Sequence, residues 1–284
     1  MSIHAHVSAA RQRLRDAGIT PTESDLDARL LAQHVLGWTT ERFLIDAREP
    51  VPDGFTPRYD ELVARRVTRE PLAYIVGVRE FWGLDLEVTP DVLIPRPATE
   101  LIVEAIQELF PDRSVPLSIA DVCTGCGCVA VAIAHERPAA TIRGTDISRP
   151  ALDVARRNAV RHGVAERITF TYGDLLEGIT GVFDAIVANP PYVIDRAGPA
   201  LQPEVRDHEP PVALFGGIDG LTLVTRLVAA VPGRLRTGGY LIFEFGLGQD
   251  VEIENLIEAS AELRLVDLRR DLQGIARTAI ARRT

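Results

Sequence analysis

Lysine is absent from this chain of 284 residues, so all 31 of its basic side chains are arginines. The absence excludes enzymes that form a Schiff base on a lysine, and it excludes the nucleotide-binding loops in which a lysine contacts phosphate. Acidic residues number 40 and the net charge is −9. An acidic chain without lysine repels phosphate polymers, so we expect no direct binding to nucleic acids.

Cysteine is scarce, and its three copies, Cys123, Cys126 and Cys128, lie in one six-residue segment. They are too few and too close together to form the disulfide framework of a small secreted protein. They could be three ligands of a zinc ion, but no fourth ligand stands at a typical spacing. We therefore expect small buried side chains and no metal.

Long apolar stretches are also missing. No run reaches the roughly 20 residues that cross a bilayer, and the N-terminal segment lacks the apolar core of a signal peptide. We expect a cytoplasmic protein with no membrane partner. The composition, 46% hydrophobic and 25% charged, indicates a globular chain with one large and one small domain.

Hydrophobic periodicity divides the chain into three parts. Residues 1–73 carry apolar side chains at helical spacing and predict a small helical domain. Residues 74–90 change from helical spacing to an alternating pattern, with Gly83 available for a turn, and predict a β-hairpin that links two domains. In residues 91–284, short apolar runs alternate with amphipathic helices, which predicts an α/β domain with a largely parallel sheet covered on both faces.

A glycine-containing loop, DVCTGCGCVA (residues 121–130), follows the first predicted strand of this α/β domain. Gly125 and Gly127 allow the backbone to approach a ligand closely. Asp146 ends the next predicted strand, where a carboxylate can accept hydrogen bonds from both hydroxyls of a ribose. This pattern favours a nucleoside ligand, but it also fits dinucleotide binding or a structural turn.

The sequence Asn189-Pro190-Pro191-Tyr192 follows the apolar run FDAIVA at a predicted strand end. Proline has no backbone N–H, so the carbonyl groups here are free to face a substrate. The Asn189 side-chain oxygen and the Pro190 carbonyl can accept both hydrogens of an –NH2 group, while Tyr192 flanks the planar group. Positioning of this kind suffices for methyl transfer from a sulfonium, without a metal or a covalent intermediate. The competing interpretation is a Pro-Pro turn with an Asn cap.

Together these blocks resemble the bacterial release factor glutamine methyltransferases. That family uses S-adenosylmethionine to methylate the glutamine of the Gly-Gly-Gln motif in peptide-chain release factors. Similar blocks follow one another along most of the chain, at 71–88, 93–101, 189–193, 204–221 and 238–249. The resemblance implies a class I methyltransferase-like fold: a doubly wound, mostly parallel seven-stranded sheet, with a small N-terminal helical domain for substrate recognition and a linking β-hairpin.

The resemblance also implies which residues bind the cofactor. The methionine part of S-adenosylmethionine is expected on the glycine loop, which comprises Cys123, Thr124, Gly125, Cys126 and Gly127. The ribose is expected on Asp146 and the adenine beside Asp174 and Leu175. Asn189 would contact both cofactor and substrate.

For the substrate, the resemblance places the target amide against Pro190, Pro191 and Tyr192, next to Asn189. Arg96 and Glu100 belong to a family loop beside the pocket and are expected to bind substrate. At Glu100, however, a carboxylate in the first turn of a helix is equally explained by the helix dipole.

Two departures from the family pattern leave a second function open. Ala98 stands where the family usually has Glu or Asp, and Cys126 and Cys128 replace residues that are usually Gly or Ser and a small apolar side chain. The alternative is therefore methylation of a small molecule or free amino acid at an amide, amine or guanidine. Glu244, at the end of the predicted strand LIFEF, either faces the cleft or pairs with an arginine.

Overall fold

The computed structural model describes residues 2–284, and the chain forms two compact units. A helical unit contains the residues up to Gly77 together with Gln202–His208. An α/β unit contains Val78–Leu201 and Glu209–Thr284. The chain thus passes from one unit to the other after residues 77, 201 and 208. The hairpin that we predicted as a linker belongs to the α/β unit, and the short return at 202–208 was not predicted.

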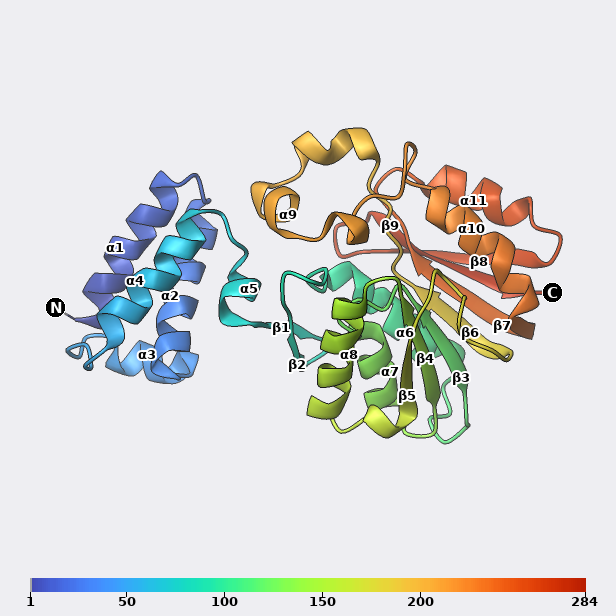
Figure 1. Cartoon of the computed structure of the whole chain (residues 1–284), viewed down its shortest axis with the longest axis horizontal. Helices are drawn as coiled ribbons and strands as arrows, with labels where there is room; N and C mark the ends of the chain where they lie inside the picture. The colour runs from blue at the N-terminus through green and yellow to red at the C-terminus, as the bar shows by residue number, and fades with distance from the viewer. Residues whose placement is uncertain (1) are drawn as a thin grey trace. The chain divides into compact units, whose positions relative to one another are not determined.

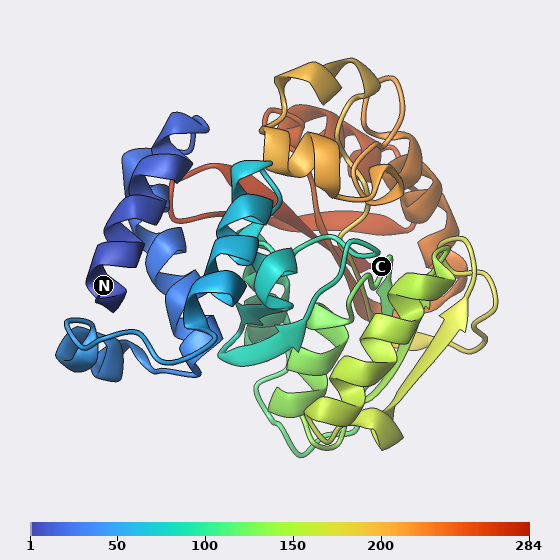
Figure 2. The same ribbon diagram turned by 60° about the vertical axis from the view of Figure 1, so that its left-hand side comes forward.

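The helical unit consists of α1 (Ile3–Asp16), α2 (Pro21–Leu36), α3 (Thr40–Asp46), α4 (Phe55–Val67), α5 (Leu72–Val76) and the inserted α9 (Pro203–His208). Figure 2 shows α1, α2 and α4 packed side by side. Val7, Leu31 and Val63 are fully buried between them, as the helical spacing of apolar residues predicts.

Residues 74–76, predicted as the start of the hairpin, form the end of α5 instead. Pro71 stands at the N-cap, where its missing N–H costs no helical hydrogen bond. Gly77 ends the helix with a φ of 76°, a left-handed conformation that glycine adopts without steric cost. Local capping thus overrides the alternating pattern of the side chains.

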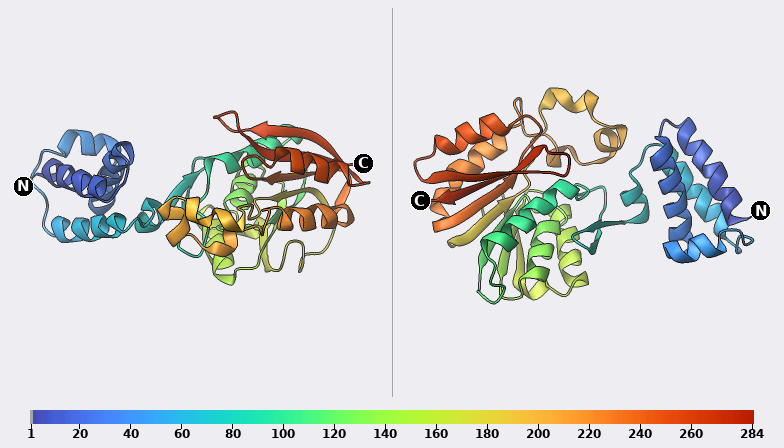
Figure 3. Two further views of the ribbon diagram at one scale, coloured as in Figure 1. Left: turned by 90° about the horizontal axis from the view of Figure 1, so that it is seen from above. Right: turned by 180° about the vertical axis from the view of Figure 1, so that it is seen from behind.

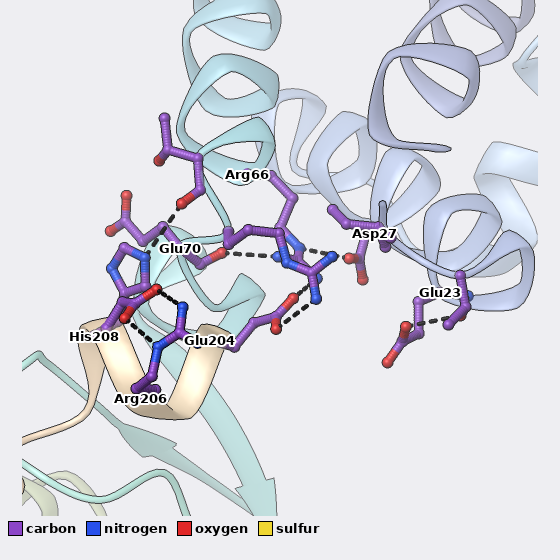
Figure 4. Close-up of polar contacts among 12 residues, drawn as sticks. Glu23, Asp27, Arg66, Glu70, Glu204, Arg206 and His208 are labelled. Carbon is purple, nitrogen blue, oxygen red and sulfur yellow. Dashed lines mark hydrogen bonds and ion pairs between the residues drawn. The ribbon is translucent and has the colours of Figure 1, made fainter. Parts of the chain in front are cut away.

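A buried network of charges joins α2, α4 and α9 within the helical unit (Figure 4). The Arg66 guanidinium lies 2.7 Å from the Asp27 carboxylate and 3.0 Å from that of Glu204. Arg69 pairs with Glu204 at 2.7 Å. Burial raises the pKa of Asp27 against the opposing effect of Arg66. Burial also acts on Glu204, but the hydrogen bonds from Arg69 and Arg66 outweigh it and hold the pKa of Glu204 below its ordinary value.

The α/β unit contains a hairpin of β1 (Val78–Phe81) and β2 (Leu84–Glu87) and a sheet of seven strands in the order β5-β4-β3-β6-β7-β9-β8. The parallel strands are β3 (Ser118–Val122), β4 (Thr141–Asp146), β5 (Ile168–Tyr172), β6 (Phe183–Ala188) and β7 (Leu235–Glu244). At one edge, red in Figure 3, lie β8 (Leu263–Arg270) and β9 (Ala276–Arg283), and β9 pairs antiparallel with both β7 and β8. The mostly parallel, seven-stranded sheet is therefore confirmed.

Helices cover both faces of this sheet (Figure 1). One face packs against α6 (Glu100–Leu109), α7 (Cys128–Glu136) and α8 (Arg149–Arg161), and the other against α10 (Thr222–Ala230) and α11 (Asp250–Glu258). Short 3-10 turns complete the chain at Pro97–Thr99, Ala165–Arg167, Asp195–Ala200, Pro211–Ala213 and Val231–Gly233. Ile119 and Ala120 are buried on opposite faces because successive side chains of a strand alternate.

The order of the strands determines where a ligand can bind. From β3 the chain moves outward through β4 to β5 and then returns to β6 on the other side of β3. The loops after β3 and β6 therefore diverge and leave a crevice at the carboxyl ends of these neighbouring strands.

None of the helices within residues 2–284 is both long and apolar enough to span a bilayer.

Candidate active site

A cavity lies in the α/β unit at the carboxyl ends of β3, β4 and β6. Its empty space, together with the open solvent at its mouth, is about 920 Å³. The predicted site residues that line it are Cys123, Thr124, Gly125, Cys126, Asp146, Asp174, Leu175, Asn189 and Pro191. Both sequence signals, the glycine loop and the Asn-Pro-Pro-Tyr motif, thus contribute to one cavity.

The glycine loop has a backbone conformation that few residue types adopt. Cys123, Gly125 and Gly127 all have positive φ, of 59°, 54° and 79°. A Cβ atom added at Gly127 would lie 3.0 Å from the Cβ of Ala155 in α8, so both the conformation and the space require glycine. The loop therefore presents its backbone to the cavity close to the start of α7.

Asp146 connects the ends of β3 and β4. One of its carboxylate oxygens accepts the N–H of Gly125 at 2.9 Å, and the other accepts the N–H of Ser148 at 2.8 Å. Burial raises the pKa of Asp146, although these backbone donors oppose the rise. Each carboxylate oxygen has a further lone pair, so Asp146 can support the loop and still accept a hydrogen bond from a ligand.

Asp121 is buried beneath the same loop and accepts the hydroxyl of Thr124 at 2.5 Å. Burial raises the pKa of Asp121 to about 7, against the hydrogen bonds from Thr124 and Ala130. Its ordinary value is 3.8. Between these two values the folded protein holds a proton that the unfolded chain has released. The contribution of Asp121 to stability must therefore decrease as the pH rises from about 4 to about 7.

We expect Asp121→Asn, which keeps the shape of the side chain but has no carboxyl group to titrate, to remove this pH dependence. The measurement is the thermal midpoint of both proteins from pH 4.5 to pH 8. The midpoint of the variant should gain on that of the wild type as the pH rises toward 7, and the difference should then level off. Parallel curves for the two proteins would contradict a raised pKa at this position.

Asn189 and Glu244 lie together because their strands are neighbours. In the parallel pair β6 and β7, Ala188 faces Phe243, so the next residue of each strand reaches the same edge of the sheet. The Asn189 side-chain N–H donates to the Thr99 hydroxyl oxygen at 3.1 Å. The Thr99 hydroxyl in turn donates to one Glu244 carboxylate oxygen at 2.6 Å, and the Tyr192 hydroxyl donates to the other at 2.7 Å.

Neither orientation predicted for Glu244 is the one observed: it does not line the cavity, and in residues 2–284 its carboxylate is hydrogen-bonded by the Thr99 and Tyr192 hydroxyls instead of an arginine. The side chain is 1% exposed, and burial raises its pKa against the opposing hydrogen bonds from Thr99 and Tyr192. Burial and the adjacent Glu244 also raise the pKa of the Tyr192 hydroxyl, so this tyrosine stays protonated. Sequence reasoning missed Thr99, which lies between two residues that it had considered.

Two further loops enclose the backbone of the motif. A Cβ atom at Gly216 would lie 2.4 Å from the carbonyl oxygen of Pro191, and one at Gly220 would lie 2.3 Å from that of Tyr192. The Gln249 side-chain N–H donates to the same Tyr192 oxygen at 3.2 Å. These residues were not singled out from the sequence, although they lie in the blocks 204–221 and 238–249.

The structure places Arg96, Ala98 and Glu100 around the cavity without making them part of its lining. Arg96 pairs at 2.6 Å with the buried Glu209, whose pKa burial raises against the effect of this arginine. The Glu100 carboxylate accepts the N–H of Trp82 at 2.9 Å and so supports the hairpin turn. The substrate roles of Arg96 and Glu100 remain predictions.

The three cysteines are free and line the cavity. Burial raises the pKa of Cys123, and a hydrogen bond with Cys126 together with burial raises that of Cys128. These two thiols therefore stay protonated, whereas metal ligation and nucleophilic attack need the thiolate. Throughout residues 2–284, the structure has no group of three or more His, Cys, Asp or Glu side chains placed to hold a metal ion.

Models of two protein families match the chain. The PrmC N-terminal domain matches residues 7–77, and the methyltransferase small domain matches residues 96–203. The first match covers the N-terminal part of the helical unit, and the second contains the glycine loop and the Asn-Pro-Pro-Tyr motif.

Relatives with similar sequences span the whole chain. A release factor glutamine methyltransferase of Bradyrhizobium diazoefficiens is 40% identical over 95% of this chain and 91% of its own length. One of Moorella thermoacetica is 38% identical over 100% of this chain and 99% of its own length. One of Nitratidesulfovibrio vulgaris is 39% identical over 96% of this chain and 92% of its own length.

Solved structures support the same fold at lower identity. A methyltransferase from Pyrococcus furiosus is 17% identical, with a TM-score of 0.52 over 77% of this chain and 96% of its own. The T. thermophilus 16S rRNA N2 G1207 methyltransferase, solved with AdoMet and guanosine, is 19% identical. Its TM-score is 0.51 over 73% of this chain and 50% of its own. At such identities the likeness concerns the fold alone.

Proposed function

Because the chain belongs to the family of release factor glutamine methyltransferases, we propose that it methylates the side-chain amide nitrogen of the Gly-Gly-Gln glutamine in peptide-chain release factors, with S-adenosylmethionine as the methyl donor. The observation that carries the proposal is the orientation of Asn189. Its N–H donates to Thr99, so its side-chain oxygen is left to accept from a substrate at the cavity. The proposed reaction takes place in the cytoplasm, where release factors act.

The residues at the cavity fit an adenosine-containing cofactor. The loop 123–127 presents backbone at positive φ, and Asp146 retains lone pairs for ribose hydroxyls. Asp174 and Leu175 line the same cavity after β5 and would lie beside the adenine. S-adenosylmethionine, when bound, supplies an electrophilic methyl group on its sulfonium.

The chain would contribute orientation rather than covalent chemistry. The Asn189 oxygen and the Pro190 carbonyl would accept the two N–H groups of the substrate amide and so direct its nitrogen toward the cavity. Tyr192, held through its hydroxyl by Glu244, would flank the planar amide. The protonated thiols of Cys123 and Cys128 do not compete as nucleophiles.

The role of Asp146 leads to a prediction on cofactor affinity. Asp146→Asn keeps one acceptor oxygen but places an –NH2 group where the second oxygen accepts a backbone N–H. We expect the Kd for S-adenosylmethionine to rise about 10- to 100-fold, in line with the loss of a charge-assisted hydrogen bond. Isothermal titration calorimetry measures this. An unchanged Kd would remove Asp146 from the cofactor site.

The proposed function is tested by mass spectrometry of a bacterial release factor after incubation with this protein and S-adenosylmethionine. We expect one added methyl group on the Gly-Gly-Gln glutamine. The matched control is a release factor in which this glutamine is replaced by alanine, and it should gain no methyl group. Cofactor binding by calorimetry without any glutamine-dependent methylation would contradict the proposal.

The alternative acceptor, a small amide, amine or guanidine, was suggested by Ala98 and by the cysteines of the glycine loop, Cys126 and Cys128, which do line the cavity. In the structure Ala98 does not line the cavity, and its neighbour Thr99 supplies the polar group there. The argument from Ala98 is thus weakened. Methylation of small nitrogen acceptors, but not of a release factor, in the same experiment would restore it.

A further inference from the structure

We infer that Thr99 and Glu244 are positioning residues that determine which end of the Asn189 amide faces the substrate. The inference rests on the proposed function, because it concerns how the motif presents an acceptor to an –NH2 group. It adds two residues outside the Asn-Pro-Pro-Tyr motif to the groups on which the reaction depends.

The direction of the hydrogen bonds carries the inference. A threonine hydroxyl has one proton, and here it is donated to the Glu244 carboxylate at 2.6 Å. The hydroxyl oxygen can then only accept from Asn189, so the –NH2 end of the Asn189 amide must point to Thr99, at 3.1 Å. The oxygen end is left for the substrate. Without the carboxylate, the hydroxyl could donate to Asn189 and favour the opposite orientation of the amide.

The position of Thr99 supports this role independently. Thr99 is the last residue of the 3-10 turn Pro97–Thr99 that runs into α6, and its φ of −67° and ψ of −20° are helical. Its side chain makes no capping hydrogen bond, although the residue is only 1% exposed. The buried hydroxyl is therefore committed to Asn189 and Glu244.

Glu244 accepts the hydrogen bonds that hold both ends of the motif in place. Its second oxygen accepts the Tyr192 hydroxyl at 2.7 Å, so the two hydroxyls that hold Asn189 and Tyr192 share one carboxylate. Glu244 lies at the end of β7, next to the strand that carries Asn189, so the sheet places it there directly. A carboxamide in its place has only one acceptor oxygen and cannot serve both hydroxyls.

The chain allows a direct test of the amide orientation, because it contains three asparagines, Asn158, Asn189 and Asn255. Selective labelling with 15N-asparagine would give three side-chain –NH2 signals in an NMR spectrum. Asn158 donates to two buried carbonyl oxygens, of Glu87 and Cys126, and provides a protected reference. Asn255 is exposed on α11 and provides a solvent-like reference.

We compare Thr99→Val, which removes the hydroxyl at nearly equal volume, with Thr99→Ser, which keeps it. The Asn189 –NH2 signal should exchange slowly, like that of Asn158, in the wild type and in Thr99→Ser. In Thr99→Val it should shift and exchange like that of Asn255. An unchanged Asn189 signal in Thr99→Val overturns the inference, whether or not the protein methylates a release factor.

Kinetics of release factor methylation provide the second readout. We expect Thr99→Val to lower kcat about 10- to 100-fold, while the KM for S-adenosylmethionine changes less than about threefold, since orientation and not cofactor binding is lost. Thr99→Ser should restore most of kcat. Glu244→Gln should lower kcat about tenfold through the hydroxyl that loses its acceptor.

Equal losses in Thr99→Ser and Thr99→Val would assign the effect to packing and overturn the inference. A Glu244→Gln variant with wild-type kcat would show that Glu244 does not help to orient Asn189. If the wild type itself transfers no methyl group to the release factor, the proposed function fails, and the NMR comparison still decides the orientation of Asn189.

Discussion

Asn189→Ala is expected to abolish most of the methyl transfer, with kcat lowered about a hundredfold to a thousandfold, because the variant loses the side-chain oxygen that would accept an N–H of the substrate amide. The partly buried Asn189 lies at the end of β6 and lines the cavity. The truncation removes a single hydrogen bond to Thr99 and leaves the hydroxyl bond to Glu244 in place. The fold and the glycine loop should therefore persist. The measurement is kcat for methylation of the release factor glutamine.

Asn255→Ala is the matched control, since it makes the same substitution at an exposed position of α11 and should leave kcat unchanged. The Kd of Asn189→Ala for S-adenosylmethionine, measured by calorimetry, separates lost catalysis from lost binding. A decrease in kcat of less than about threefold in Asn189→Ala would mean that positioning by the Asn189 side chain contributes little.

The parts of the site that the sequence predicted are those encoded by local pattern. Gly125 and Gly127 stand at fixed offsets after an apolar run, and Asn189 follows another, so the loops at the carboxyl ends of two strands could be identified. Asp146 ends β4, the neighbour of β3 on the side away from β6. Neighbouring parallel strands bring these ends to one edge of the sheet, and the structure confirms that the loops meet at one cavity.

The contacts that sequence reasoning missed join residues far apart along the chain. Thr99 and Glu244 are separated by 145 positions, and Asn189 by 90 from Thr99. Periodicity reports which face of an element is buried, but not which polar side chain on another element completes its hydrogen bonds. From the sequence alone, a threonine next to a helix start, such as Thr99, would in addition be expected to cap that helix.

The return of residues 202–208 to the helical unit was missed for a similar reason. The sequence QPEVRDH is mostly polar and short, and nothing in its spacing indicates which unit it packs against. Its partner is a buried arginine, Arg66, 138 positions earlier, next to Asp27 on α2. Charge pairing of this kind is specific in three dimensions and carries no periodic signal.

Among the residues of the helical unit, we therefore expect substitution of Arg66 to lower the free energy of unfolding most. Its side chain is 5% exposed, and it neutralises Asp27, which is 8% exposed, and shares Glu204 with Arg69. Arg66→Met leaves the Asp27 carboxylate buried without its cation, a situation that typically destabilises by about 3–5 kcal/mol. We expect a lower free energy of unfolding for the helical unit, and faster amide hydrogen exchange in α2, α4 and residues 202–208.

The neighbouring Arg65 is the matched control, because it makes a single ion pair with Glu70 and is 40% exposed. Arg65→Met should cost less than about 1 kcal/mol, as exposed ion pairs do. In the double variant Arg66→Met/Asp27→Leu neither charge remains unpaired, since Glu204 keeps Arg69, so much of the lost stability should return. Equal destabilisation by Arg65→Met and Arg66→Met would contradict a special role of the buried network. Equal exchange rates at 202–208 in the Arg66→Met variant and the wild type would mean that Arg69 alone suffices to hold this segment on the helical unit.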